Sequence, residues 1–518
     1  MAIHGGLRVF AKLIIVTGAT LLLLGIIGLV VVAHSNDHYC GKQGYGVVFD
    51  AGSSHTSMAI YQWLGETTNG TGIASEVAYI SDCTEDGIAT RPDDQEAIAA
   101  GLGQCLNTAK LAVPDFSHEY TPVYLGATAG MRMLAETFPA KTDTIMKTIR
   151  KTLADSPFSF EDEQKQARIL TGQSEGKDGW VSANYLAGNL GVVPASGSKS
   201  SIFSPRKPIP PRPTFGALDF GGASLQISFI PEDPSSVPTS SLVKLRLYGT
   251  DYQVYTHSYL CYGANEIRRR FEASLVKNSG YSSVLSNPCS PSGYSYTVSG
   301  ADIWKAPCSS GPADMMDDAI FTLNGTSDPE GCYNATKRLF DFGAPCAEPP
   351  CSIDGVHSPL PFGSFKAFNG FAYTSNGVGL SSTPTLPAFL NKTREYCTLT
   401  IDELNRLPEQ FKFKLRFCFQ GMYIRIILLE AFKFEESNWD MEFTLKVNNV
   451  QLGWSLGYMV DATNRLPEER PCVGLIQANM IGLLFMLVMI SLLGLLLVVL
   501  GVKISGMASP PSYQAEVV

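Results

Sequence analysis

Two long uncharged segments, one near each end of the chain, dominate its hydropathy pattern. Leu13–Ala33 is a run of 21 residues without a charge, and Met480–Val502 is a second run of 23. Each is long enough to cross the hydrocarbon core of a bilayer as a helix. Arg8 and Lys12 precede the first run as in a secretory signal peptide, but the run is longer than the apolar part of such a peptide and lacks a small-x-small cleavage site. We therefore predict two retained membrane anchors.

Basic residues beside the anchors predict their orientation. Arg8 and Lys12 lie before the first anchor and Lys503 follows the second, and short flanking segments that carry Lys and Arg stay in the cytoplasm. Residues 1–12 and 503–518 are thus expected to be cytoplasmic, and the 439 residues from His34 to Cys472 to be extracellular. The anchors could also pack against those of a second chain, which leaves a homo-oligomer open.

Between the anchors, short apolar runs alternate with turn residues and with helical spacing, as is typical of an α/β domain. Residues 44–49 predict a strand, which enters a tight turn at Asp50, and His55–Trp63 predicts the returning strand. Thr142–Ala154 has apolar residues at helical spacing. Ser196–Pro213 has no period and is rich in Ser, Lys and Pro, so we expect a surface loop there.

Cysteines and glycosylation sequons indicate that the central region lies in an oxidising compartment. All 12 cysteines lie between Cys40 and Cys472, and five of them fall in Cys289–Cys351, which predicts an irregular insert held by disulfides. Structural zinc is disfavoured because none of the seven histidines has a metal-binding spacing. Four sequons lie in the same region, at Asn69, Asn324, Asn334 and Asn391.

The central region is acidic, with 36 Lys and Arg against 47 Asp and Glu, a net charge of about −11. This excludes the basic surface that a nucleic-acid-binding protein needs. A phosphate-bearing ligand would have to be bound by specific local groups, because the net negative charge of the region would not attract it.

One turn sequence occurs twice in similar form. Val47-Val-Phe-Asp50-Ala-Gly-Ser-Ser is echoed by Ala217-Leu-Asp219-Phe-Gly-Gly-Ala-Ser224, since each has apolar strand residues, an Asp, small residues and a hydroxyl. Backbone N–H groups in such a turn can converge on an anion where no side chain blocks the approach. The Asp cannot bind phosphate itself, but it can hold Mg²⁺ or Ca²⁺, directly or through water. A single turn of this kind is usually a plain hairpin, whereas two predict paired domains that face each other across a phosphate-binding cleft.

Two further segments between the turns are unusual. Tyr124–Arg132 is a small-residue loop that runs into a helix, with Thr128 as its only aliphatic hydroxyl. Glu175 lies between glycines, just ahead of an apparent helix at Val181–Ala187. Glu175 is either a solvated loop carboxylate or a general base that activates water.

In these motifs the chain resembles the ecto-nucleoside triphosphate diphosphohydrolases, or ecto-apyrases, of the plasma-membrane branch. The resemblance is carried in order by DAGSSHTS, YLGATAGMRML, TGQSEG, GALDFGGASLQ and GWSLGYM, and it covers nearly the whole extracellular region. It implies a two-lobed α/β fold of the actin-like, ribonuclease H-like class between two transmembrane helices, 13–33 and 480–502. Residues 46–170, completed by 446–468, would form lobe I, and 171–445 would form lobe II with the insert 289–351.

The resemblance also implies an activity: stepwise hydrolysis of extracellular nucleoside tri- and diphosphates to monophosphates, with Ca²⁺ or Mg²⁺. Asp50 and Asp219 would position the cation through its water shell, and Glu175 would be the base, with Ser224 and Gln226 orienting the water. The phosphate-binding positions would be Ser53, Ser54, His55, Thr128, Ala129, Gly221, Gly222 and Ala223. Tyr373 would stack on the nucleotide base or fill the core, and Trp454 would brace the phosphate-binding turns or fill the core.

Five disulfides follow from the resemblance as well: Cys83–Cys105, Cys261–Cys308, Cys289–Cys332, Cys346–Cys351 and Cys397–Cys418. Cys40 and Cys472 remain, and they could pair with each other, join subunits or stay free.

Two other function classes stay open at this stage. A related actin-like phosphotransferase, such as a sugar kinase, would use the same nucleotide-binding turns with an acceptor other than water. A glycosylated receptor or adhesion ectodomain would keep the fold without catalysis. The presence of Asp50, Glu175 and Asp219 favours the hydrolase, because a pure binding protein needs no base.

Overall fold

The computed structural model describes residues 2–39, 43–64, 67–84, 86–192, 212–315, 319–408, 413–466 and 477–507. The chain divides into a terminal unit, made of Met1–Gln43, Leu64–Glu66 and Glu468–Val518, and a central unit, Gly44–Trp63 with Thr67–Pro467. Cys40, Cys472 and most of the loop expected at 196–213 lie outside the described residues.

The terminal unit consists mainly of two helices, α1 (Ala2–Tyr39) and α15 (Gln477–Met507). Within them, Gly6–Val32 and Gly482–Met507 are long and apolar enough to cross a membrane. The helices pack closely, since a Cβ added to Gly18 would lie 2.7 Å from the carbonyl oxygen of Gly494. Close backbone approach at small residues is typical of helices that associate in lipid.

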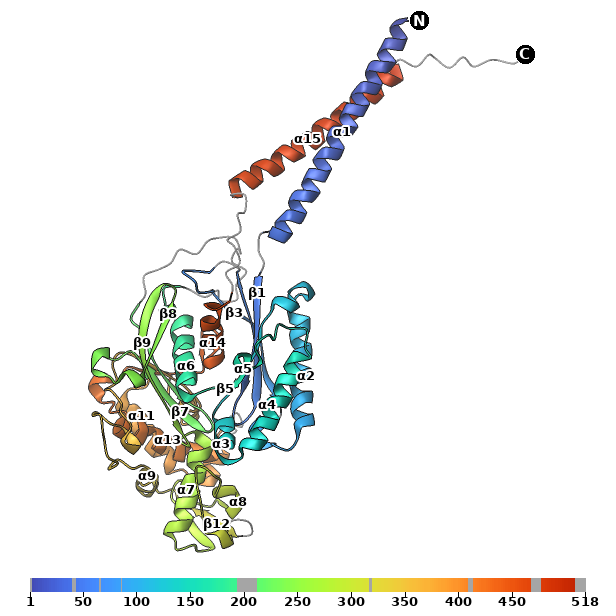
Figure 1. Ribbon diagram of the computed structural model, residues 1–518. Coiled ribbons are helices and arrows are strands. Elements are labelled where there is room, and N and C mark those ends of the chain that lie inside the picture. The colour runs from blue at the N-terminus through green and yellow to red at the C-terminus, as the bar shows by residue number, and fades with distance from the viewer. Residues whose placement is uncertain are drawn as a thin grey trace. The chain divides into compact units, whose positions relative to one another are not determined.

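The central unit holds two large mixed sheets (Figure 1). The first has the strand order β3-β2-β1-β4-β5, with β1 parallel to β4 and β4 parallel to β5. Its strands are β1 (Gln43–Ala51), β2 (Thr56–Leu64), β3 (Ser75–Thr84), β4 (Val123–Ala127) and β5 (Ala167–Ile169).

The second sheet repeats this arrangement with one extra edge strand. Its order is β14-β13-β6-β7-β9-β8, with β6 parallel to β13 and antiparallel to β7. Its strands are β6 (Gly216–Phe220), β7 (Ser224–Phe229), β8 (Leu242–Leu247), β9 (Thr250–Leu260), β13 (Phe365–Asn369) and β14 (Met441–Phe443). In both sheets the first strand along the chain is central, with the second strand on one side and a parallel strand on the other. This duplicated topology is that of the two-lobed actin-like class.

Helices cover the outer faces and separate the sheets. Those grouped with the first sheet are α2 (Gln95–Ala112), α3 (Ala129–Thr137), α4 (Pro139–Ala154) and α5 (Glu163–Gln166). Those grouped with the second are α7 (Ala264–Asn278), α9 (Pro329–Lys337), α10 (Gly370–Gly377), α11 (Leu386–Cys397), α12 (Ile401–Asn405) and α13 (Phe417–Ile426). Pro139 at the first turn explains why α4 begins before the predicted Thr142, because proline is favoured there.

Two helices, α6 (Gly172–Leu186) and α14 (Trp454–Thr463), pack on each other between the sheets (Figure 1). The apolar cluster around them includes Trp180, Trp454, Val48 of β1 and Phe368 of β13, so it draws on both sheets. Helix α6 begins nine residues before the Val181 expected from the sequence. The Thr171 hydroxyl caps it by accepting from the Ser174 N–H at 3.1 Å.

The cysteine-rich insert is more regular than the sequence predicted. It supplies β11, β12 and a short helix, α8 (Gly300–Ile303), and its strands join the preceding β10 in a three-stranded sheet of order β10-β12-β11. Trp304 and Leu323 of the insert share an apolar cluster with Val276 of α7. The strands are β10 (Val284–Asn287), β11 (Ser295–Ser299) and β12 (Ile320–Gly325); a separate hairpin is formed by β15 (Lys446–Val447) and β16 (Val450–Gln451).

The described residues contain five disulfides, and they are the pairs that the resemblance implies: Cys83–Cys105, Cys261–Cys308, Cys289–Cys332, Cys346–Cys351 and Cys397–Cys418. The asparagines of all four sequons are exposed, as attachment of a glycan requires.

Candidate active site

The two turns with similar sequences occupy equivalent places in the two sheets. Asp50 is the second-to-last residue of β1, and Asp219 is the second-to-last residue of β6. Both strands are the central strands of their sheets, and each runs beside a parallel partner, with Asp50 opposite Gly126 and Asp219 opposite Phe368. The duplicated topology therefore carries both carboxylates to the same edge of their respective sheets.

The turns that follow these strands approach each other directly. Asn265 donates from Nδ2 to the Ser54 hydroxyl at 3.1 Å. A Cβ added to Gly222 would lie 2.9 Å from Ser54 Oγ and would also meet Ser53 Oγ. Glycine at 222 thus lets the two turns approach closely, because a side chain there would meet both serine hydroxyls of the facing turn.

A second hydroxyl segment adjoins the first turn. The N–H of Thr128 donates to the carbonyl oxygen of Ala51 at 3.1 Å, and Ala129 begins helix α3 as a buried residue. Thr128 and Ala129 therefore lie beside the end of β1, as the resemblance implies. His55 is exposed, and Ala223 is buried where a side chain on Gly263 would meet its N–H.

Three buried carboxylates, Asp50, Glu175 and Asp219, influence one another electrostatically. Burial, followed by repulsion from Glu175, raises the pKa of Asp50 to about 7. Burial and then repulsion from Glu175 raise the pKa of Asp219 to about 8, although Asn369 opposes this by donating to Asp219 Oδ1 at 2.7 Å. Asp50 Oδ1 is buried and has no hydrogen-bond partner among the described residues. Three carboxylates this close together can all be ionised only if positive charge nearby offsets their mutual repulsion.

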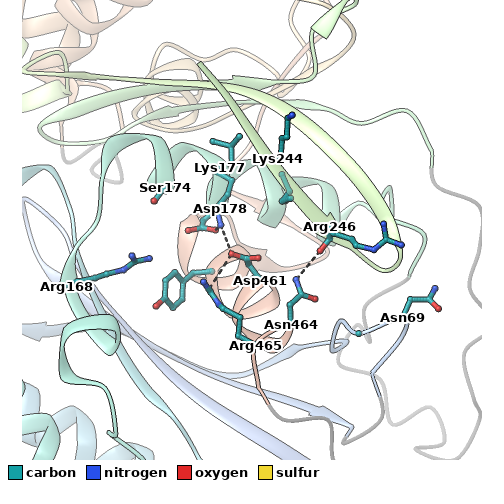
Figure 2. A pocket seen from close by; sticks show the side chains of 14 residues that line it. Asn69, Arg168, Ser174, Lys177, Asp178, Lys244, Arg246, Asp461, Asn464 and Arg465 are labelled. Atoms are coloured by element: carbon teal, nitrogen blue, oxygen red, sulfur yellow. Dashed lines mark hydrogen bonds and ion pairs between the residues drawn. The ribbon is translucent and has the colours of Figure 1, made fainter. Parts of the chain in front are cut away.

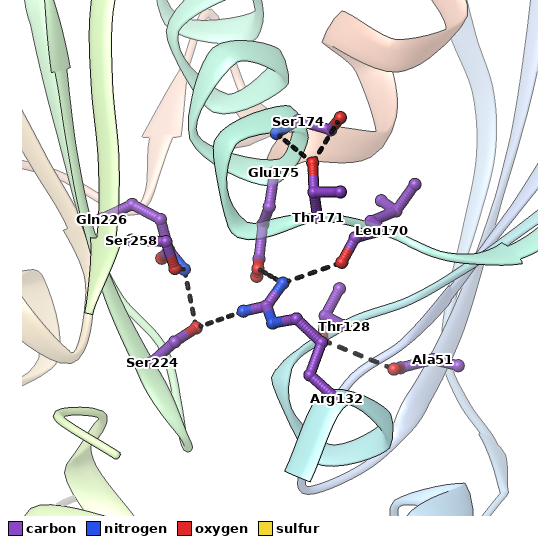
Figure 3. Close-up of polar contacts among 10 residues, drawn as sticks. All are labelled: Ala51, Thr128, Arg132, Leu170, Thr171, Ser174, Glu175, Ser224, Gln226 and Ser258. Atoms are coloured by element: carbon purple, nitrogen blue, oxygen red, sulfur yellow. Dashed lines mark hydrogen bonds and ion pairs between the residues drawn. The ribbon is translucent and has the colours of Figure 1, made fainter. Parts of the chain in front are cut away.

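Arg132 supplies part of that charge (Figure 3). Its Nη1 donates to Glu175 Oε2 at 2.8 Å and to the carbonyl oxygen of Leu170 at 3.0 Å, and its Nη2 donates to Ser224 Oγ at 3.1 Å. Burial raises the pKa of Glu175, while Arg132 works in the opposite direction. Glu175 is thus a buried carboxylate in the first turn of α6, and the interpretation as a solvated loop residue is wrong.

Ser224 and Gln226 form a hydrogen-bonded pair on β7 (Figure 3). Gln226 Nε2 donates to Ser224 Oγ at 2.6 Å and to Ser258 Oγ at 2.9 Å. Its Oε1 is buried and has no partner within the described part of the chain. A free acceptor at this point can receive a hydrogen bond from a water molecule.

The two aromatic candidates differ in exposure. Tyr373 on α10 is 51% exposed, which does not fit a core residue. Its phenol contributes to raising the pKa of Tyr79 on β3, so the two tyrosines lie near each other from opposite sheets. Trp454 is buried, and its ring lies against Gly126 of β4, where an added Cβ would clash with the ring atom Cη2.

Sequence reasoning missed two partners of the acids, Arg132 and Asn369, and it also missed Asn265, which donates to the Ser54 hydroxyl. Arg132 stands inside a motif that the sequence singled out, but its side chain reaches residues 43 and 92 positions away. Asn369 precedes α10 with a positive φ of 54°, a conformation that asparagine tolerates better than most residues. Only a pattern linking distant segments would have revealed these contacts.

The donor set fits a divalent cation bound by oxygen. Mg²⁺ and Ca²⁺ prefer carboxylate oxygens and water, and here two aspartates with an unpartnered oxygen lie near a third acid. Among the described residues, the one group of three ligand atoms close enough together to hold an ion directly is that of Cys332, Cys397 and Cys418; the three acids do not form such a group. These three sulfurs belong to disulfides, so they are not thiolate ligands.

Known proteins resemble this chain over most of its length. A model of the GDA1/CD39 (nucleoside phosphatase) family matches residues 37–474. Ectonucleoside triphosphate diphosphohydrolase 8 of Gallus gallus is 37% identical over 82% of this chain and 84% of its own. Ectonucleoside triphosphate diphosphohydrolase 3 of Homo sapiens is 33% identical over 91% and 89%, respectively. A solved structure of nucleoside triphosphate hydrolases from Neospora caninum has a similar fold, with a TM-score of 0.57 and 16% identity over 85% of this chain and 96% of that chain.

Proposed function

The chain belongs to the GDA1/CD39 nucleoside phosphatase family, and we propose that it hydrolyses extracellular nucleoside tri- and diphosphates to monophosphates and inorganic phosphate. The observation that carries the proposal is the meeting of Asp50, Glu175 and Asp219 between two facing glycine-containing turns. The names of the relatives agree with it, since they are diphosphohydrolases of nucleoside triphosphates.

The two turns would hold the phosphate chain. Ser53, Ser54 and His55 on one side, and Gly221, Gly222 and Ala223 on the other, would present backbone N–H groups and hydroxyls to it, with Thr128 and Ala129 beside them. Backbone donors suit this region because it is acidic overall, so general electrostatic attraction does not bring the substrate in.

Asp50 and Asp219 would hold a Ca²⁺ or Mg²⁺ ion through its water molecules. When bound, the cation neutralises charge on the phosphates and on the buried acids. The raised pKa values of both aspartates support this assignment, because their ionised forms lack sufficient protein partners.

Glu175 would act as the base. It would take a proton from a water molecule whose oxygen attacks the terminal phosphorus in line, as the bond to the bridging oxygen breaks. Gln226 Oε1 would accept the second hydrogen of that water, and the Ser224 hydroxyl would lie beside it. Arg132 would keep Glu175 in its ionised form and fix its orientation.

The nucleotide base would stack on Tyr373, whose exposure supports a ligand contact. Trp454 would support the phosphate-binding turns from behind. We further propose that the protein is a two-pass protein of the plasma membrane with this domain outside the cell, where it would remove nucleotide signals. The length and apolarity of α1 and α15 support two passes.

The two alternatives predict different products. A phosphotransferase would move the terminal phosphate only to a second substrate, and a receptor ectodomain would release none. The test uses intact cells that express the full chain, supplied with extracellular ATP or ADP. We expect free phosphate and AMP in the medium, without any added acceptor, and no release when a chelator is present. Release that persists in chelator, or that needs an added acceptor, contradicts the proposal.

A further inference from the structure

A hollow of about 610 Å³ lies beside α6 and is lined by Ser174, Lys177 and Asp178 of that helix (Figure 2). Its walls come from β5, α6, β8 and the end of α14, which includes elements of both sheets. Ser174 and Lys177 line it, while Glu175 does not. Glu175 and Lys177 point in different directions because residues two apart on a helix differ by about 200°.

The hollow is basic although the region around it is acidic. Five cationic side chains line it against two acidic ones. The cations are Arg168, Lys177, Lys244, Arg246 and Arg465. The acids, Asp178 and Asp461, leave an excess of three positive charges in a region whose net charge is about −11. A concave basic surface in an acidic domain concentrates the local field and favours an anion.

The two acids are already neutralised within the hollow. Lys177 Nζ lies 2.6 Å from Asp178 Oδ1 and 2.7 Å from Asp461 Oδ2. Arg465 Nη2 lies 3.5 Å from Asp461. Lys177 is thus paired with both acids at the base of the hollow, and the other cations are the ones that can bind a ligand.

Two of those cations have no carboxylate partner within the described ranges, namely Arg168 and Lys244. Arg168 Nε is buried without a hydrogen bond there, and its guanidinium lies 6.0 Å from the ring of Tyr458. Arg246 pairs instead with the exposed Asp251 at 2.8 Å. Arg168 lines the hollow without a carboxylate partner among the described residues, and a guanidinium of this kind is well suited to bind phosphate oxygens.

We propose that this hollow is a second anion site, which binds a small anion carrying several phosphate groups. Arg168 reaches it from the first sheet and Lys244 from the second, so one multivalent anion contacts both. A single phosphate does not span such a hollow, whereas a chain of two or three phosphates offers each of the separated cations its own oxygens. The site is separate from the catalytic turns, and it does not depend on the function proposed for them.

Isothermal titration of the purified full-length protein with inorganic tripolyphosphate tests this proposal. The titration is made in chelator, which removes the divalent cation that the catalytic turns are proposed to need. We expect one site per chain, whose affinity falls about tenfold or more in the double variant Arg168→Gln/Lys244→Gln. The control Lys147→Gln/Lys151→Gln removes the same charge from the exposed face of α4 and should bind like the wild type.

Hydrolysis of ATP with cation present checks that the Arg168→Gln/Lys244→Gln variant is folded, because neither residue belongs to the proposed catalytic set. The proposal is overturned if the wild type does not bind tripolyphosphate in chelator, or if the double variant binds as tightly as the wild type. It is also overturned if Gly222→Ala, in the catalytic turn, weakens binding as much as the double variant does.

Discussion

Arg132 of helix α3 and Glu175 of helix α6 form a largely buried ion pair of 2.8 Å. The same guanidinium also donates to Ser224 on the second sheet, so one cation links the proposed base to the residues proposed to orient the water. Substitutions can therefore distinguish two roles. Glu175 would take the proton from water, whereas Arg132 would position the Glu175 carboxylate and keep it ionised.

Replacing Glu175 with Gln should remove the base while keeping the size and shape of the side chain. We expect turnover of ATP to fall by about 10²- to 10⁴-fold, while nucleotide affinity stays within a few-fold of wild type. Steady-state kinetics and equilibrium binding of ATP measure the two quantities. Glu136→Gln, an exposed change on α3, is the matched control and should leave turnover unaltered. If the Glu175→Gln variant turns over ATP as fast as the wild type, Glu175 is not the base.

Replacing Arg132 with Met should raise the pKa of Glu175, because burial already raises it and Arg132 is the opposing influence. The acid limb of the pH profile of kcat should therefore move to higher pH. Arg132→Lys, which keeps the charge but loses the fork of donors, should shift the limb less and still lower kcat. If both variants keep the wild-type pH profile, Arg132 is only structural.

Chelation should destabilise the protein more at high pH than at low pH. The pKa values of Asp50 and Asp219 are raised to about 7 and about 8, so the folded state holds protons that the unfolded state has lost. Without cation, the free energy of unfolding therefore falls as the pH rises from about 4, the usual pKa of an aspartate, to about 8, and bound cation offsets the fall. Melting temperatures at pH 5 and pH 8, with Ca²⁺ or chelator, measure the effect.

The variant Asp50→Asn/Asp219→Asn provides the control for that experiment. It should lose cation-dependent hydrolysis, and its melting temperature should respond equally to chelator at both pH values. A cation effect on stability of the same size as in the wild type would place the cation elsewhere.

Gly222→Ala should impair binding of the phosphate chain rather than folding of the lobes. The new Cβ would lie 2.9 Å from Ser54 Oγ and would also meet Ser53 Oγ, which pushes the two turns apart. We expect KM for ATP to rise several-fold or more with a small change in melting temperature. Gly103→Ala in α2, where a Cβ meets nothing within 4 Å, is the control and should be neutral or stabilising. An unchanged KM in Gly222→Ala would contradict the facing-turn geometry.

His257 on β9 should make the protein sensitive to mild acid. Burial lowers its pKa to about 4, so below pH 6.5 this histidine binds a proton in the unfolded state but not in the folded state. Stability should be lost as pH falls from about 6.5 to about 4, by roughly 2 kcal/mol between pH 7 and pH 5. His257→Gln should remove this part of the pH dependence, as measured by denaturant unfolding at the two pH values. An equal loss in the variant would assign the acid sensitivity to other groups.

The sequence predicted the repeated turns because their chemistry is local. An Asp at the end of an apolar strand, followed by small residues, predicts a tight turn after that strand, and Asp50 and Asp219 occupy equivalent strand positions. The disulfide pairs came from resemblance, since spacing alone does not choose among possible partners.

The start of α6 was not predictable from local pattern. Gly172, Gly176 and Gly179 lower helix propensity, so the sequence favoured a loop around Glu175. In the fold, a Cβ on Gly176 would lie 2.7 Å from Ser228 Oγ of the second sheet. The glycines allow α6 to pack closely on that sheet, and this tertiary contact outweighs propensity. Arg132 was missed for a similar reason, because its partners are distant in the chain.

The position of α14 constrains how the protein is made. This helix packs on α6 late in the chain, and the Gly457 N–H donates to the Ser182 hydroxyl at 2.7 Å across 275 residues of sequence. The apolar cluster between the sheets includes Trp454, Met459 and Val460, so it cannot close until nearly the whole domain has been synthesised. Until then the apolar faces of the first sheet and of α6 remain uncovered, and long-range closure of this kind is slow and prone to aggregation. We therefore expect truncation before residue 454 to prevent the central unit from folding, however complete its remaining motifs.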